Sequence, residues 1–204
     1  MGDARFGWFA DAMELRGTDR VLEIGPGSSP SLALLAERVP DGRVVGVDRS
    51  ATAIARAARR LGGGGRGAPT DHAEPSADHR DAPLAAIPAA QANSGRIDLV
   101  HADLTRLRPE QVLDDIGIDG FDKILAVNVN VFWTKRPTAE FALLTRLLAP
   151  HGGLYLCYGY GDPDDVSTSP KPSPGRLEEH LAEAGFTIRT LASGDLLCVH
   201  AALD

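Results

Sequence analysis

The chain has 204 residues, of which 43% are hydrophobic and 24% are charged, as in an ordinary globular protein. Its length suits one domain, 1–204, with a single hydrophobic core. Its net charge of −7 disfavours nucleic acid and anionic membranes as partners, since these bind to broad basic surfaces, and leaves only a local basic patch open. The two cysteines, Cys157 and Cys198, lie inside apolar runs. We expect them to be buried thiols that form no disulfide framework.

Targeting and membrane signals are not found in the sequence. Residues 1–10 lack the basic region and the uninterrupted apolar stretch of a secretory signal. No apolar run approaches the roughly 20 residues that a membrane span needs. We therefore expect a cytoplasmic protein with no membrane and no nucleic-acid partner, and the sequence leaves both a monomer and a homodimer open.

Short apolar runs alternate with segments of helical spacing along most of the chain. Such alternation predicts parallel strands joined by right-handed crossovers, and the last two runs are too close for a helix between them, which predicts an antiparallel hairpin. The fold class is therefore α/β: a three-layer, doubly wound sheet of seven strands, mostly parallel, with an antiparallel C-terminal hairpin strand. The expected strands are 20–24, 43–48, 96–101, 121–128, 154–158, 186–191 and 195–201, and the expected helices are 5–15, 31–39, 51–61, 108–116, 138–148 and 174–184.

Residues 62–95 break the pattern. Glycines, prolines and small polar residues supply too little apolar surface to offset the entropy of ordering, so we expect a flexible insertion with one short turn near 84–87. His72 and His79 lie in this segment near acidic residues. We predict no metal site there, because the residues lack both ligand spacing and a rigid support.

The first strand runs into a glycine-rich turn, Glu23-Ile-Gly-Pro-Gly27, that is followed by a helix. Glycines let the backbone approach a ligand closely, and the helix start presents unpaired N–H groups. Enzymes that bind dinucleotides use the same geometry, but they place a third glycine where this chain has Pro30. The Glu23 carboxylate would repel a diphosphate and attract an amino group.

Asp48 ends the second strand, where its carboxylate can accept hydrogen bonds from both hydroxyls of a ribose. An acidic residue at this position suits dinucleotides as well as other nucleosides. Asp48 therefore indicates binding of a ribose and does not distinguish between the two classes of cofactor.

With its glycine turn and Asp48, the chain resembles the class I S-adenosylmethionine-dependent methyltransferases. The family's first motif, an acidic residue followed by alternating glycines, matches Glu23, Gly25 and Gly27, and the third glycine often found there is Ser29 here. The resemblance implies S-adenosyl-L-methionine as cofactor, with its amino group near Glu23 and its adenosine near Asp48. The cofactor-binding residues that it implies are Glu23, Gly25, Pro26, Gly27, Asp48, Arg49, Ala102, Asp103, Leu104 and Asn128.

Two of these residues also have plainer explanations. Asp103, after the third strand, matches the family's adenine-binding position, although an aspartate after a strand is also a common turn residue. Asn128, after the fourth strand, matches the position that borders the methyl group, and an amide there can equally cap a turn. Pro150-His-Gly-Gly153 and Ala184-Gly-Phe186 resemble further family turns, and the likeness covers the chain apart from the insertion.

Residues that contact the substrate are harder to predict. Aromatic and amide side chains near the expected mouth of the site are the candidates, with core packing as an equal alternative. They are Trp8, Asn130, Trp133, Tyr158 and Tyr160. No catalytic residue is predicted, because in-line methyl transfer needs alignment and no nucleophilic side chain. If the acceptor requires a base, Tyr158, Tyr160 and His101 are the candidates.

The favoured function is methyl transfer to a small-molecule acceptor, because the chain has little beyond the core with which to grip a macromolecule. Two alternatives stay open: a catalytically silent subunit that binds the cofactor, and a nicotinamide-dependent oxidoreductase. Pro30, Glu23 and the terminal hairpin count against the oxidoreductase.

Overall fold

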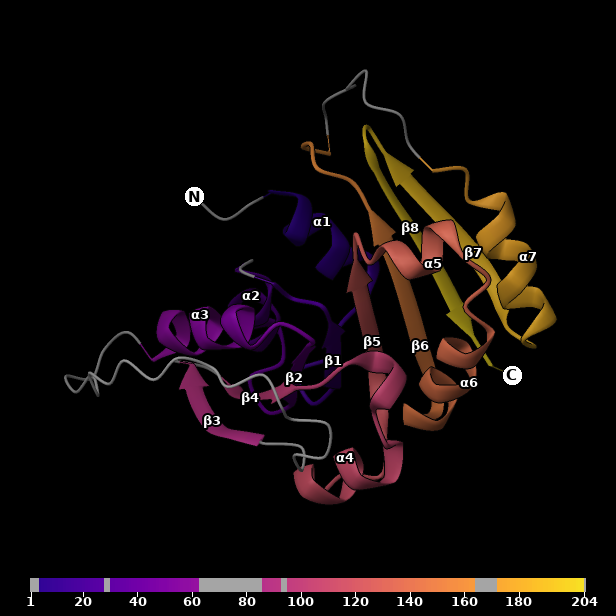
Figure 1. Cartoon of the computed structure of the whole chain (residues 1–204). Coiled ribbons are helices and arrows are strands. Elements are labelled where there is room, and N and C mark those ends of the chain that lie inside the picture. The colour runs from indigo at the N-terminus through magenta and orange to yellow at the C-terminus, as the bar shows by residue number, and fades with distance from the viewer. Residues whose placement is uncertain (1–3, 28–29, 63–85, 93–94, 164–171, 204) are drawn as a thin grey trace.

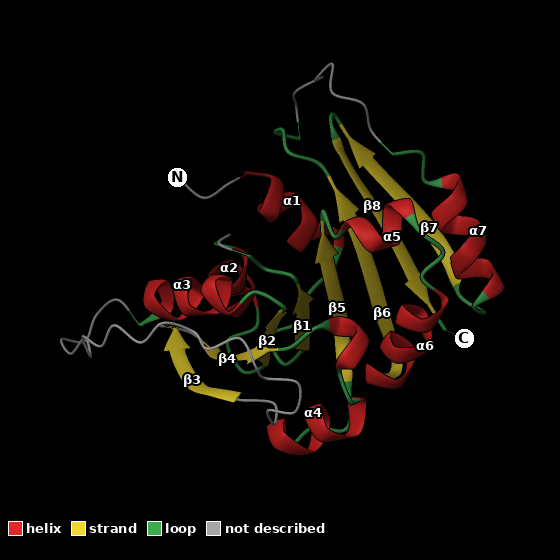
Figure 2. Cartoon of the chain, in the orientation of Figure 1, coloured by secondary structure: helices red, strands yellow, loops and turns green. Residues whose placement is uncertain are grey.

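A computed structural model describes residues 4–27, 30–62, 86–92, 95–163 and 172–203. One twisted sheet runs through the molecule with helices on both faces (Figures 1 and 2). Its strand order is β3-β4-β2-β1-β5-β6-β8-β7. The strands are β1 (Arg20–Ile24), β2 (Arg43–Asp48), β3 (Ala86–Ala92), β4 (Gly95–His101), β5 (Phe121–Val127), β6 (Leu148–Tyr158), β7 (Thr187–Ser193) and β8 (Leu196–Ala202). The helices are α1 (Ala4–Ala12), α2 (Ser31–Arg38), α3 (Ala51–Leu61), α4 (Pro109–Ile116), α5 (Asn130–Thr134), α6 (Thr138–Leu147) and α7 (Gly175–Glu183), with a 3-10 turn at Leu104–Arg106.

The α/β prediction is confirmed. Strands β4, β2, β1, β5 and β6 pair in parallel, and β7 and β8 form the expected antiparallel hairpin, with β8 also antiparallel to β6. Two apolar cores cover the two faces of the sheet: α1, α2 and α3 pack on one face, and α4 to α7 pack on the other. The topology reverses between β1 and β5, where ligands bind in open sheets of this kind.

Strand β1 divides its side chains between the two cores. Leu22 and Ile24 belong to the core beneath α4 to α7, whereas Val21 belongs to the core beneath α1 to α3. The alternation of a strand therefore directs Glu23 toward α2, where it meets Ser31. The local sequence decides on which side of the sheet this carboxylate lies.

Strand β3 corrects the prediction that residues 62–95 hold no regular structure beyond one turn. Ala86–Ala92 pairs antiparallel with β4 and adds an eighth strand at the edge of the sheet. The register shifts between Ile87 and Ala90, around Pro88. A proline is tolerated at an edge strand or a bulge, since it has no N–H to donate. The strand is formed by backbone pairing with β4, and the sequence shows no alternation of apolar and polar residues that would predict it. The rest of the expected insertion, with His72 and His79, lies outside the described residues.

Two further boundaries differ from the prediction. The short helix α5 was not expected, and β6 begins at Leu148, so the proline-glycine-glycine segment lies inside the strand and not before it. The β5–β6 register is irregular there, with Phe121 opposite Leu148 but Lys123 opposite Gly153. The extra residues are accommodated as a bulge, with His151 exposed at a φ of 61°.

Other expectations hold in detail. The Ser50 side chain caps α3 by accepting from the backbone N–H of Ala53, and Gly185, with a φ of 89°, follows the end of α7. Cys157 and Cys198 are buried free thiols that face each other across β6 and β8.

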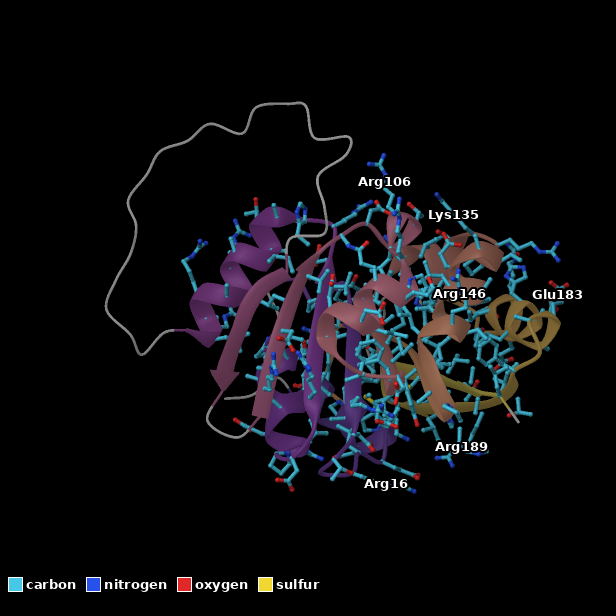
Figure 3. All side chains as sticks on the ribbon, turned by 90° about the horizontal axis from the view of Figure 1, so that it is seen from below. Arg16, Arg106, Lys135, Arg146, Glu183 and Arg189 are labelled. Carbon is cyan, nitrogen blue, oxygen red and sulfur yellow. The ribbon has the colours of Figure 1, made fainter. Side chains whose placement is uncertain are left out.

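No helix in the described parts of the chain is long and apolar enough to cross a membrane. Charged side chains such as Arg16, Arg146 and Arg189 project outward around the ribbon (Figure 3).

Candidate functional site

Two cavities adjoin at the carboxyl ends of the central strands. The larger has a volume of about 560 Å³ and lies over the ends of β1, β2 and β4, while the smaller, of about 380 Å³, lies between α1 and the ends of β1 and β5. Gly25 and Asn128 line both cavities. A ligand with two parts could therefore extend from one cavity into the other past these two residues.

The glycine turn after β1 is fixed by hydrogen bonds to the end of β2. Gly25 and Gly27 adopt left-handed φ values of 68° and 61°, which favour glycine. The Gly25 N–H donates to the Val47 carbonyl at 2.7 Å, and the Gly27 N–H donates to the Asp48 carboxylate at 3.0 Å. The other Asp48 oxygen accepts from the Ser50 N–H at 2.8 Å. Asp48 thus holds the turn in place and also forms part of the wall of the larger cavity.

Glu23 is a buried carboxylate in the wall of the smaller cavity. Its side chain is 1% exposed, and the Ser31 hydroxyl lies 2.7 Å from each of its two oxygens. Burial raises the pKa of Glu23 to about 7; the Ser31 hydrogen bond opposes the increase and the Asp48 charge adds to it. A cationic group placed in this cavity would favour the ionised carboxylate.

Asp103 follows β4 in the larger cavity, beside Ala102 and Leu104, with Arg49 in the same wall. Its carboxylate accepts from the Thr105 N–H at 2.9 Å and from the Thr105 hydroxyl at 2.6 Å, which caps the 3-10 turn. These bonds, led by the hydroxyl bond, lower the pKa of Asp103. The residue therefore does act in a turn, and it also offers an ionised acceptor to the cavity.

Asn128 has a left-handed φ of 56° and joins the ends of β5 and β6. Its Nδ2 donates to the Gly159 carbonyl at 3.0 Å, and its Oδ1 accepts from the Gly159 N–H at 3.0 Å. Both polar ends of the amide are thus used within the protein. Asn128 shapes the junction of the cavities, and its predicted place beside a transferred methyl group stays a prediction.

Three aromatic rings form a row next to the smaller cavity. Trp133 lies 5.6 Å from Tyr158, and Tyr158 lies 5.8 Å from Tyr160, both edge to face. Tyr160 lines the smaller cavity and is 69% exposed, whereas Trp133 and Tyr158 are half-buried behind it. The buried Trp133 Nε1 has no acceptor among the described residues. Of the other candidate substrate residues, Asn130 lines the larger cavity.

Trp8 and His101 are not among the residues that line the two cavities. Trp8 packs edge to face on the buried Phe9, with ring centres 5.5 Å apart, and lines neither cavity. The exposed His101 places its Nε2 3.1 Å from the Arg49 carbonyl. Their predicted roles as substrate contact and base gain no support from these positions.

Several residues that line the cavities are not among the predicted site residues. Arg5 and Phe6 of α1 line the smaller cavity, and Lys135 and Glu140 line the larger one. Arg5 reaches the Gly159 carbonyl from 154 positions away in the chain. Such a contact depends on how α1 docks on the sheet, so no local sequence pattern predicts it.

Within the described ranges, no group of three histidine, cysteine, aspartate or glutamate side chains is placed so that it could hold a metal ion.

Comparisons with known proteins identify the fold. No protein-family model matches the sequence, and no curated protein sequence matches it either. Solved structures of S-adenosylmethionine-dependent methyltransferases superpose on nearly the whole chain. The resemblance predicted from the sequence is thus confirmed at the level of the fold.

Three solved structures illustrate the likeness. A methyltransferase from Aquifex aeolicus superposes with a TM-score of 0.66 at 15% identity, over 98% of this chain and 89% of that one. The glycopeptide N-methyltransferase MtfA with sinefungin gives 0.65 at 13% identity, over 100% and 94%. The magnesium protoporphyrin IX methyltransferase of Synechocystis with bound S-adenosylmethionine gives 0.60 at 15% identity, over 98% and 76%.

Proposed function

We propose that the protein binds S-adenosylmethionine across the two adjoining cavities. The observation that carries this proposal is the distribution of polar groups: the buried Glu23 carboxylate lies at one end, and the Asp48 and Asp103 carboxylates lie at the other. The amino-acid part would occupy the smaller cavity and the adenosine the larger one. The residues proposed to bind it are Glu23, Gly25, Pro26, Gly27, Asp48, Arg49, Ala102, Asp103, Leu104 and Asn128.

Each acidic residue suits the part of the cofactor it would meet. Glu23 would receive the ammonium group, Asp48 has lone pairs for the ribose hydroxyls beyond those used by Gly27 and Ser50, and Asp103 could accept from the adenine amine. The neighbours solved with S-adenosylmethionine and with sinefungin bound support the same choice of ligand.

The reaction proposed is transfer of a methyl group to a small-molecule acceptor by in-line displacement. The cofactor, when bound, supplies a methyl group on a positively charged sulfur. The protein's task is to align the acceptor behind that methyl carbon, which can remove roughly 7–11 kcal/mol of the barrier without a nucleophilic side chain. Asn128 and Gly159 would fix the wall at this point through their paired hydrogen bonds.

A small-molecule acceptor is favoured because the chain has little beyond its core with which to bind a macromolecule. Tyr160 would form the exposed edge of the smaller cavity, in contact with the Tyr158 ring, which in turn contacts Trp133. Tyr158 and Tyr160 remain the candidates for a base where the acceptor is weakly acidic.

Binding measurements test the cofactor. Calorimetric titration with S-adenosylmethionine, its demethylated product and NAD should give binding of the first two and none of the third. Preferential binding of NAD would overturn the proposal in favour of the oxidoreductase, which the Glu23 carboxylate in the smaller cavity already disfavours.

Catalysis needs a separate experiment, since a silent subunit would also bind the cofactor. The protein should be incubated with methyl-labelled cofactor and pooled metabolite extracts, and label should appear in a small-molecule fraction. Binding without transfer to any pool would favour the silent subunit.

A further inference from the structure

The smaller cavity combines one charge of each sign. Among the described residues that line it, Glu23 is the only acidic side chain and Arg5 is the only basic one. The two come from different elements, β1 and α1. The amino-acid part of S-adenosylmethionine carries the complementary pair, an ammonium and a carboxylate. A cavity that binds it through Glu23 alone would leave the carboxylate unmatched.

Arg5 is held in position by the protein itself. Its Nη1 donates to the Gly159 carbonyl at 3.3 Å, and its guanidinium carbon lies 4.8 Å from the centre of the Phe6 ring and 6.0 Å from that of Tyr160. Gly159 is in turn fixed by both polar ends of Asn128. Contacts with two rings and a carbonyl restrict the guanidinium before a ligand arrives, which reduces the entropy lost on binding.

The backbone donors of the neighbouring turn are already engaged. Within the described part of that turn, the Gly25 N–H donates to Val47 and the Gly27 N–H donates to Asp48, and Pro26 has none to offer. Across the cavity, the Asn128 N–H donates to the Cys157 carbonyl at 2.9 Å. These three backbone groups are therefore not available to a carboxylate.

We infer that Arg5 is the receptor for the carboxylate of the cofactor's amino-acid part, opposite the ammonium group at Glu23. The guanidinium suits a carboxylate because it can donate two parallel N–H bonds. This inference rests on the proposed function and adds a specificity to it. The protein would select nucleosides that carry an intact amino-acid group over those that have lost the carboxylate.

The test compares two ligands by calorimetry: S-adenosylhomocysteine and its analogue without the α-carboxylate. In Arg5→Met, the affinity for S-adenosylhomocysteine should fall about tenfold or more, as expected for the loss of a charge-assisted pair. The affinity for the analogue should change less than about twofold, because that ligand has no group for Arg5 to bind. Arg5→Lys should restore part of the difference. Arg56→Met, on the exposed face of α3, is the control for removal of an arginine.

The outcomes separate the inference from the proposed function. Equal losses for both ligands in Arg5→Met would show that Arg5 only supports Gly159 and the cavity wall, and no loss for either would show that it does not contact the ligand. Both results would overturn the inference about Arg5. The proposed cofactor would still be supported, provided that the wild-type protein binds S-adenosylhomocysteine. Failure of the wild-type protein to bind S-adenosylhomocysteine would overturn the proposed function itself.

Discussion

The two cavities differ in the sequence separation between the residues whose hydrogen bonds hold their walls. In the larger one, Asp48 and Asp103 bond to residues within two positions of themselves, Ser50 and Thr105, in turns that directly follow strands. In the smaller one, Arg5 bonds to Gly159 across 154 positions. Groups placed by local turns can be predicted from sequence, whereas groups placed by the docking of distant elements cannot. The junction residue Gly25 belongs to both cavities, so changes there should have the largest effect.

The first prediction concerns Gly25→Val. A side chain at this position would have to adopt a φ of 68°, and its Cβ would lie 3.3 Å from the Val129 side chain, inside the junction of the cavities. We expect the affinity for S-adenosylhomocysteine to fall about a hundredfold, because backbone strain and steric blockage act together. Calorimetry measures the loss, and thermal unfolding should remain cooperative.

A glycine elsewhere provides a matched control for backbone strain. Gly117 has a φ of 75°, and a Cβ there would meet nothing within 4 Å. Gly117→Val should therefore lower the melting temperature and leave the affinity unchanged. Equal binding losses in the two variants would mean that general destabilisation, and not the junction, explains the effect of Gly25→Val.

Asp48→Ala should have the next largest effect. The change removes the acceptor proposed for the ribose and the bond that holds the Gly27 N–H. We expect the affinity for S-adenosylhomocysteine to fall about tenfold or more, since hydrogen bonds to charged groups contribute roughly 1.5–3 kcal/mol. Asp115→Ala, on the exposed surface of α4, controls for the lost charge. Unchanged affinity in Asp48→Ala would contradict the placement of adenosine in the larger cavity.

Glu23 should make binding depend on pH. With the pKa of Glu23 raised to about 7 by burial, the carboxylate is mostly protonated at pH 5.5 and mostly ionised at pH 7.5. Because an ammonium group binds the ionised form, the affinity for S-adenosylhomocysteine should rise about tenfold over this range. Glu23→Gln should bind weakly at both values with a flat profile, and Glu37→Gln, exposed on α2, should follow the wild type. An equally steep profile in Glu23→Gln would assign the dependence to another group.

The same shift affects stability in the opposite direction. The folded pKa lies above the ordinary value of 4.5, so the folded state binds the proton more tightly, and stability is lost as the pH rises from about 4.5 to about 7. At about 1.4 kcal/mol per pH unit, the loss amounts to roughly 3 kcal/mol by pH 8. Glu23→Gln should therefore raise the melting temperature at pH 8 and have little effect on it at pH 4. A buried charge is thus kept at the expense of stability, as expected where it serves a ligand.

The fold was more predictable than the site. Seven strands and the hairpin follow from periodicity, and the turn after β1 follows from its glycines. Helix α5 has only five residues, Asn130–Thr134, too few for a periodic pattern to show. Trp133 and Tyr158 were predicted to contact the substrate, which stays a prediction, and their contact with each other depends on where the distant helix α5 packs. Trp8 is also aromatic and was predicted on the same grounds, but it packs on Phe9. The sequence alone does not reveal which face of α1 meets the sheet.

Strand β3 should have the smallest effect on binding, although it is the largest departure from the predicted fold. It lies at the edge of the sheet and pairs with β4. Deleting residues 64–93 should lower the melting temperature, since each backbone hydrogen bond contributes about 0.5–1.5 kcal/mol. It should also promote self-association, because β4 becomes an unpaired edge. The affinity for S-adenosylhomocysteine should change less than about twofold, since Ala102 and Asp103 are held by Asp48 and Thr105.

The control is a shorter deletion of residues 64–83, which keeps β3. It should leave stability and association close to those of the wild type. A large loss of affinity in the longer deletion alone would mean that the cavity depends on the edge strand, and that local turns are not sufficient to hold its carboxylates.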